Sequence, residues 1–176
     1  MTEKEMVSVY ISLGSNIGDK KNNLLSAVQL LKEHGEISVK EISPFYKTEP
    51  VDYLDQDWFV NGVLMAETSL RPTGLMKALK NIEKTLKQGK KAVRFGPRII
   101  DLDIIYYGDT IMDTDTLIIP HPRMHRRCFV LKPLCDMEKS IVHPVLKLWP
   151  NELLERLLKR SDNKENQKVI LINEEE

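Results

Sequence analysis

The sequence predicts an α+β fold in which helices pack on an antiparallel sheet, and three observations lead to this expectation. Apolar residues alternate along several short segments, they recur at helical spacing along longer ones, and these segments follow one another as strand, helix, strand, strand, helix, strand. This order is that of the ferredoxin-like α/β sandwich, in which helices cover one face of the sheet. A length of 176 residues with 41% hydrophobic content predicts one domain over residues 1–176.

The first half of the chain carries the opening strand and helix. Apolar and polar residues alternate over residues 7–13, which is typical of a strand with one buried face. Asp19 is placed to cap a helix that ends at Gly35. Two further strands are predicted at residues 37–43 and 59–67, with a polar loop between them.

The second half repeats the pattern. A helix begins at Pro72 and ends near Gly89, and a strongly apolar strand covers residues 99–107. A short amphipathic helix at 151–159 and a last strand at 169–172 follow. We expect a polar C-terminal tail from about residue 161.

Composition excludes some classes of function. Lys plus Arg and Asp plus Glu number 26 each, so no net charge draws the chain toward nucleic acid or an anionic membrane. The apolar run at 7–13 is too short for a signal peptide or a membrane span, which predicts a cytoplasmic protein. Cys128 and Cys135 fit neither a metal knuckle nor a disulfide framework.

Asp101 and Asp103 are the strongest candidates for chemistry. On a strand they share one face, about 6.5 Å apart, while Ile100, Leu102 and Ile104 point to the other. Two neighbouring carboxylates repel each other unless a cation lies between them, and magnesium commonly uses one or two carboxylates together with phosphate oxygens. The pair therefore indicates a magnesium site, although a solvated strand face is the competing explanation.

A basic loop precedes the carboxylates. Lys90, Lys91, Arg94 and Arg98 surround Phe95-Gly96-Pro97, and such a loop beside paired acids favours binding of a polyphosphate. Other nucleotide motifs are absent: residues 14–21 lack the P-loop spacing.

Zinc is not predicted. His121 and His125 lie four apart, but Pro122 argues against a continuous helix and the Glu of the zinc-protease motif is missing. His121 and Arg127 are candidates for phosphate contacts instead.

One long run resembles a family signature. Residues 94–105, Arg-Phe-Gly-Pro-Arg-Ile-Ile-Asp-Leu-Asp-Ile-Ile, are similar to that of the 6-hydroxymethyl-7,8-dihydropterin pyrophosphokinases of folate biosynthesis. Gly14-Ser15-Asn16, the run 45–50, Phe59-Val60-Asn61 and the run 120–125 follow the same family's order. The resemblance implies a ferredoxin-like fold and transfer of pyrophosphate from MgATP to the hydroxymethyl oxygen of the pterin, with release of AMP. Association with other folate-pathway enzymes is compatible with it.

The resemblance also implies site residues. Two Mg²⁺ ions would bind Asp101 and Asp103, which with Arg94 and Arg98 form the catalytic set. The ATP contacts it implies are Lys80, Glu83, Lys90, Lys91, Arg94, Arg98, Ile104, His121 and Arg127. The pterin contacts it implies are Thr48, Glu49, Pro50, Val51, Phe59, Asn61, Phe95 and Phe129. Phe95 and Lys80 depart from the Trp and Gln found in some members.

Two alternatives stay open at this point. One is another two-metal phosphotransferase or nucleotidyltransferase that uses the same aspartates on a different acceptor. The other is a non-catalytic ferredoxin-like module that binds RNA, which the balanced charge disfavours.

Overall fold

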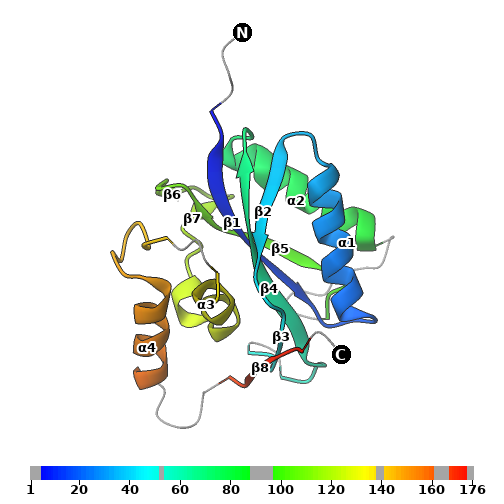
Figure 1. The fold of residues 1–176 in the computed structure, drawn as a ribbon, viewed down its shortest axis with the longest axis vertical. Coiled ribbons are helices and arrows are strands. Elements are labelled where there is room, and N and C mark those ends of the chain that lie inside the picture. Colours follow the sequence, from blue (N-terminus) through cyan, green and yellow to red (C-terminus); the bar gives the residue numbers. More distant parts are fainter. Residues whose placement is uncertain (1–4, 52–53, 88–96, 138–140, 161–166, 174–176) are drawn as a thin grey trace.

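The computed structural model of the chain describes residues 5–51, 54–87, 97–137, 141–160 and 167–173. Figure 1 shows a sheet with helices on both of its faces. In chain order the elements are β1 (Val7–Ser15), α1 (Lys20–Glu33), β2 (Ile37–Ile42), β3 (Tyr46–Thr48), β4 (Phe59–Thr68), α2 (Pro72–Lys87), β5 (Asp101–Tyr107), β6 (Met112–Asp113), β7 (Ile118–Ile119), the 3-10 helix η1 (Met124–Arg126), α3 (Cys128–Cys135), α4 (Pro150–Arg160) and β8 (Val169–Leu171).

The larger sheet runs in the order β5-β1-β4-β3-β8, and all of its pairs are antiparallel. β2 and β3 share one edge of β4, because β2 pairs with residues 64–68 and β3 with residues 59–61. β6 and β7 form a separate ribbon of two strands. The predicted antiparallel sheet is therefore confirmed, with the longest strands at its centre.

The first face of the sheet is defined as the face that α1 and α2 cover (Figure 1). A large cluster of buried apolar side chains lies there. Val9, Ile11 and Leu13 of β1 are fully buried there. Asp19 caps α1 as predicted, since its side chain accepts a hydrogen bond from the Asn22 N–H at 3.0 Å. Burial of these side chains removes apolar surface from water, which is the main force that holds the layer together.

The second face lies on the other side of the same strands, and α3 and α4 cover part of it (Figure 1). Tyr10, Val63 and Ile105 pack there against Leu131 and Leu153 of the two helices. The sequence-based expectation that helices cover one face was thus incomplete. Apolar side chains of β1, β4 and β5 point to both faces at this end of the sheet, so both need cover.

Five elements were missed: β3, the short strands β6 and β7, η1 and α3. α3 has eight residues and includes Pro133, and its largely apolar sequence shows no amphipathic period. β3 lies in the stretch predicted as a polar loop, and its three residues are too few for alternation to be recognised. The predicted last strand is confirmed as β8, which pairs with β3.

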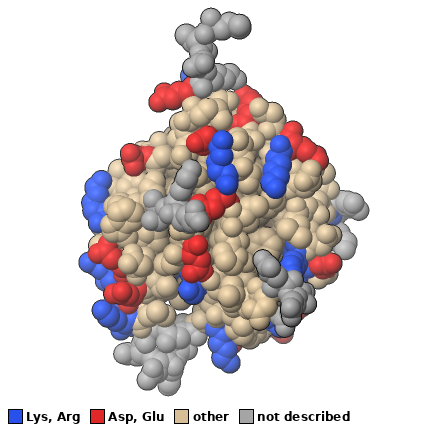
Figure 2. All heavy atoms as spheres, in the orientation of Figure 1, with Lys and Arg blue, Asp and Glu red and all other residues tan. Residues whose placement is uncertain are grey.

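Within the described ranges, no helix is both long and apolar enough to cross a membrane. On the face drawn in Figure 2, the described acidic and basic side chains are interspersed.

Candidate active site

Beyond the part that α3 and α4 cover, the second face carries several polar side chains. Gly14 of β1 pairs with Asn61 of β4 on one side and with Asp101 of β5 on the other, and Ser12 pairs with Asp103. Directly paired residues of antiparallel strands point to the same face, so these residues form one polar patch across three strands. Because Ser12 and Gly14 are small, they leave room above the carboxylates.

The two carboxylates differ in their surroundings. Asp101 Oδ2 accepts a hydrogen bond from Arg98 Nη1 at 2.6 Å. Burial, and then the nearby charge of Asp101, raise the pKa of Asp103 to about 6, although Lys80 and Arg127 act in the opposite direction. Burial and the neighbouring carboxylate thus disfavour the charged form of Asp103 more than the nearby cations favour it.

His121 is neutral near pH 7. Burial, followed by the charges of Arg127 and Arg123, lowers its pKa to about 4. Its Nδ1 accepts a hydrogen bond from the Arg123 N–H at 3.1 Å, so the proton of the neutral ring belongs on Nε2. That N–H is the type of donor that a phosphate oxygen accepts from.

A cavity of about 250 Å³ opens over the polar patch. Phe59 of β4 and Phe129 of α3 both line it, and the Arg127 guanidinium lies 5.3 Å from the centre of the Phe129 ring. The cavity is further lined by Ser12, Gly14, Thr48, Glu49, Pro50, Val51, Gln56, Asn61, Arg98, Asp101, Asp103, His121, Arg123 and Gln167. Aromatic rings with a few fixed polar groups suit a flat, polar heterocycle.

Asn61 is one of those fixed polar groups. It is 3% exposed, and its Nδ2 donates to Thr48 Oγ1 on β3. This bond sets the amide so that Oδ1 lies beside Gly14, where a Cβ atom would come within 2.7 Å of it. Glycine is therefore required at position 14 for Asn61 to keep this orientation.

A second cavity of about 310 Å³ adjoins the first. Its walls are formed by Met76, Leu79, Lys80, Leu102, Asp103, Ile104, Thr114, Asp115, Thr116, Leu117, Ile118, His121 and Pro122. Asp103 and His121 belong to the walls of both cavities. A ligand bound in the first cavity and a ligand bound in the second would therefore lie next to each other at these two side chains.

Glu83 of α2 lies behind the carboxylates rather than in either cavity. It is 4% exposed, and its Oε1 accepts from the Leu102 N–H and from Lys80 Nζ, both at 2.8 Å. Leu102 stands between the two aspartates, so Glu83 fixes the backbone that carries them. Although burial opposes it, the hydrogen bond to Glu83 raises the pKa of Lys80.

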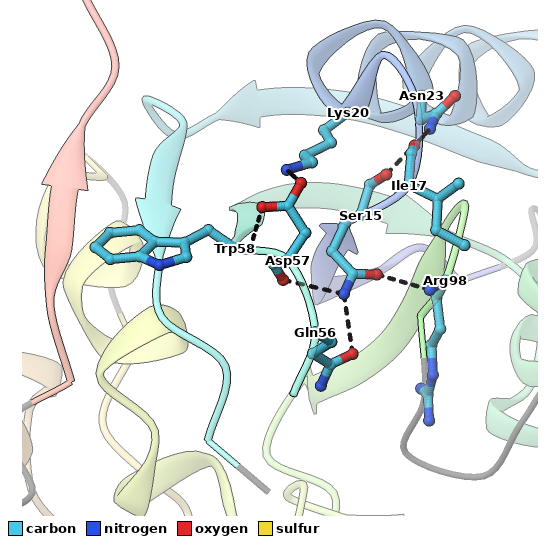
Figure 3. A network of polar contacts seen from close by, with 9 residues as sticks. Ser15, Ile17, Lys20, Asn23, Gln56, Asp57, Trp58 and Arg98 are labelled. Atoms are coloured by element: carbon cyan, nitrogen blue, oxygen red, sulfur yellow. Dashed lines mark hydrogen bonds and ion pairs between the residues drawn. The ribbon is translucent and has the colours of Figure 1, made fainter. Parts of the chain in front are cut away.

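A polar network joins the loops around the first cavity (Figure 3). Asn16 donates through Nδ2 to Gln56 Oε1 at 2.9 Å and to the Asp57 carbonyl, while its Oδ1 accepts from the Arg98 N–H at 2.7 Å. Lys20 pairs with Asp57 at 2.6 Å. Figure 3 shows the Arg98 side chain pointing away from the network, so the network holds the backbone of Arg98 and leaves its guanidinium to Asp101.

The residues present fit magnesium better than a transition metal. Among the described residues, no group of three or more His, Cys, Asp or Glu side chains could hold a metal ion. Two carboxylates beside open space match the usual ligation of Mg²⁺, which completes its shell with water and phosphate oxygens. A cation bound here would favour the charged form of Asp103, whose pKa burial and then the charge of Asp101 raise.

Known proteins account for this arrangement. A family described as 7,8-dihydro-6-hydroxymethylpterin-pyrophosphokinase (HPPK) matches residues 10–139. The chain belongs to the HPPK family. The 2-amino-4-hydroxy-6-hydroxymethyldihydropteridine pyrophosphokinase of Bacillus subtilis is 44% identical over 132 residues, which are 75% of this chain and 78% of that protein. The protein of the same name from Aquifex aeolicus is 38% identical over 142 residues, covering 81% and 87% of the two chains.

Other relatives are much longer. The folic acid synthesis protein fol1 of Pneumocystis carinii is 43% identical over 86% of this chain, which spans 20% of its length. A crystal structure of Plasmodium falciparum HPPK-DHPS A437G with pteroate superimposes with a TM-score of 0.70 at 17% sequence identity, over 96% of this chain and 47% of that one. This likeness supports the fold, and the ferredoxin-like prediction is confirmed.

Most of the site residues that the HPPK resemblance implies lie around the two cavities. Seven of the eight predicted pterin contacts line the first cavity, and so do the predicted ATP contacts Arg98 and Arg127 and the predicted metal ligand Asp101. Lys80 and Ile104 line the second cavity, and His121 and Asp103 line both. Glu83 lines neither and is occupied by its own hydrogen bonds. The remaining predictions, Lys90, Lys91, Arg94 and Phe95, lie outside the described residues.

Several lining residues were not predicted. Ser12 and Gly14 could have been found from strand alternation, since they follow Tyr10 on the face opposite to Ile11. Arg123 sits between predicted residues without a pattern of its own. Gln167 follows a polar stretch far along the chain and beyond the residues that match the HPPK family, so no sequence signal marked it.

Proposed function

We propose that the chain is a 2-amino-4-hydroxy-6-hydroxymethyldihydropteridine diphosphokinase. It transfers the β,γ-diphosphate of MgATP to the hydroxymethyl oxygen of 6-hydroxymethyl-7,8-dihydropterin. The alcohol oxygen forms a bond to the β-phosphorus, the bond between that phosphorus and the bridging α,β-oxygen breaks, and AMP leaves with this oxygen. The alcohol proton is released.

The observation that carries this proposal is the junction of the two cavities at Asp103 and His121. A transfer between two bound molecules needs their reacting atoms held about 3–3.5 Å apart. The aromatic cavity suits the pterin, and the cavity that contains Lys80 suits the nucleotide. In this proposal the alcohol and the phosphates meet at the two side chains of the shared wall, Asp103 and His121.

The pterin is held by stacking and by its polar edge. Phe59 and Phe129 supply the aromatic surfaces, and Asn61, fixed by Thr48, reads the amide edge of the ring. In this proposal the hydroxymethyl substituent of the ring points toward Asp101 and Asp103, which line the same cavity. Specificity follows because an unpaired polar group in the wall would penalise a ring with a different donor pattern.

The phosphates meet a set of charged and neutral donors. Arg98 and Arg127 line the first cavity near the carboxylates, and the Nε2–H of His121 donates without adding charge. Preorganised donors of this kind stabilise the charge that develops on the phosphate oxygens. The proposal adds Arg94, Lys90 and Lys91 to these donors on the basis of the family resemblance alone.

Asp101 and Asp103 would hold the magnesium ions. When bound, magnesium supplies positive charge that neutralises the phosphate oxygens and favours an in-line displacement. Glu83 and Arg98 position these two aspartates: Glu83 fixes the backbone between them, and Arg98 orients Asp101.

The test is a product assay. Incubation with MgATP and 6-hydroxymethyl-7,8-dihydropterin is expected to yield AMP and the pterin diphosphate in equal amounts, with no AMP when the pterin is omitted. Release of pyrophosphate instead would support a nucleotidyltransferase, and formation of ADP a simple kinase. RNA binding without turnover would overturn the proposal.

We also place the reaction in folate synthesis beside other enzymes of that pathway. Relatives named folic acid synthesis protein or folate synthesis bifunctional protein contain the matching region within much longer chains. A fused or associated neighbour would receive the pterin diphosphate directly. Co-purification of this chain with a consumer of its product would test the association.

A further inference from the structure

The C-terminal strand reaches the wall of the aromatic cavity. β8 pairs with β3, with Val169 opposite Thr48, and the ladder continues where the Glu49 N–H donates to the Lys168 carbonyl at 3.1 Å. Gln167 is next along the chain and lines the cavity. A segment beyond the residues that match the HPPK family therefore completes this wall.

Gln167 is tied to the wall by one end of its amide. Its Nε2 donates to the Glu49 carbonyl. Because a carbonyl can only accept, the nitrogen must face Glu49, and this fixes the position of the amide oxygen. Gln167 thereby restrains the backbone at Glu49, which lines the cavity next to Pro50 and Val51.

The other end of the amide has no partner in the part of the chain that the structure describes. Among the described residues, Gln167 Oε1 is the buried side-chain oxygen or nitrogen that lacks any hydrogen bond. A buried acceptor without a donor costs stability, so an apolar side chain of the same length would suit the empty protein better. An unsatisfied group in a ligand-site wall calls for a functional explanation.

We infer that Gln167 belongs to the pterin subsite, an inference that rests on the proposed function. Its Nε2 holds the Glu49 carbonyl, and its Oε1 accepts a hydrogen bond from a ring N–H when the wall closes on the bound pterin. A dihydropterin carries N–H donors on its amino group and ring nitrogens, whereas the apolar surfaces of Phe59 and Phe129 offer it no acceptor. Gln167 is thus a specificity residue for the heterocycle and has no part in binding ATP.

The experiment compares Gln167→Met with the wild-type chain. Methionine keeps the length of the side chain and removes both polar ends. Calorimetric titration with 6-hydroxymethyl-7,8-dihydropterin, in the presence of magnesium and α,β-methylene-ATP, should show about tenfold weaker pterin binding, the effect of one net hydrogen bond. The affinity for α,β-methylene-ATP should stay unchanged, and the melting temperature of the ligand-free protein should not fall.

Lys168→Ala is the matched control. Lys168 is exposed and forms an ion pair with Glu49 at 3.7 Å on the same segment, but it does not line the cavity. Its loss should leave pterin affinity within twofold of wild type, since exposed ion pairs contribute little.

Two results for Gln167→Met would overturn the inference. One is wild-type affinity for the pterin. The other is a parallel loss of affinity for the pterin and for α,β-methylene-ATP together with a lowered melting temperature, which would indicate a purely structural role. The wild-type titration separates the two proposals. A wild-type chain that binds no pterin would overturn the proposed function and the inference together, whereas failure of the variant alone leaves the function standing.

Discussion

The two faces of the sheet are made by the same strands but serve different ends. On the first face Val9, Ile11 and Leu13 of β1 are fully buried under α1 and α2. On the second face the apolar series of β1 stops after Tyr10 and is followed by Ser12 and Gly14. Alternation along one strand thus builds a core on one side and clears a site on the other.

The comparison of the two faces shows where the protein sacrifices folding stability in order to form a binding site. The first face gains the full benefit of apolar burial. The second face contains a carboxylate whose pKa burial raises to about 6, and charged side chains that no helix covers. Changes on the second face should therefore affect ligands and turnover, and changes on the first face should affect folding.

The largest expected effect is on turnover at the second face. Asp101→Asn or Asp103→Asn should lower kcat by about a thousandfold or more, because a charged metal ligand is lost while the fold is kept. Steady-state AMP formation measures kcat, and circular dichroism checks the fold. Wild-type rates in either folded variant would sink the assignment of these residues.

The first face should respond in stability instead. Leu64→Ala truncates a fully buried side chain and should lower the free energy of unfolding by about 2–5 kcal/mol. Urea denaturation measures this loss, and Leu64→Met, which conserves volume, should cost less than about 1.5 kcal/mol. The division of roles between the two faces would be contradicted if the folded Leu64→Ala protein lost as much kcat as the aspartate variants.

Arg98→Ala should reduce kcat on the order of a hundredfold, the effect of removing one preorganised donor. Its guanidinium orients Asp101 at 2.6 Å and lines the first cavity. Arg126→Ala is the control, since Arg126 is an exposed arginine of η1 that lines neither cavity. Equal rates for the two variants would remove Arg98 from the machinery.

Gly14→Ala should weaken pterin binding by about tenfold or more, because the new Cβ would lie 2.7 Å from Asn61 Oδ1 and displace the amide. Titration with the pterin measures the change. At Gly35 an added Cβ meets no described atom within 4 Å, so Gly35→Ala should bind normally. Unaltered pterin affinity in Gly14→Ala would show that Asn61 does not read the ring.

The smallest effect concerns pH. The pKa of Asp103 is raised from 3.8 to about 6, so its contribution to stability is present below pH 3.8 and is lost as pH rises through about 6. Without magnesium, Asp103→Asn should therefore melt above wild type at pH 8, on the order of 5 °C, and this gain should vanish near pH 4. Thermal melts at both pH values test this, and a lower melting temperature at pH 8 would contradict it.

Much of the fold could be predicted because its signals are local. Alternation marked β1 and β4, helical spacing marked α1 and α2, and their order predicted the ferredoxin-like class, which is confirmed. α3 escaped because eight largely apolar residues have no distinctive period. Of the site, the motifs predicted residues that the structure gathers around two cavities, and their individual roles stay predictions.

The sequence by itself determined the family, the antiparallel fold and the carboxylate pair of Asp101 and Asp103, because each depends on residues close together in the chain. Only the tertiary structure decided which part of the second face stays open, that two cavities meet at His121 and Asp103, and that Gln167 reaches a wall 118 residues from Glu49. Burial and the pKa of Asp103 likewise depend on what packs nearby in space. Contacts of this range leave no periodic trace along the chain.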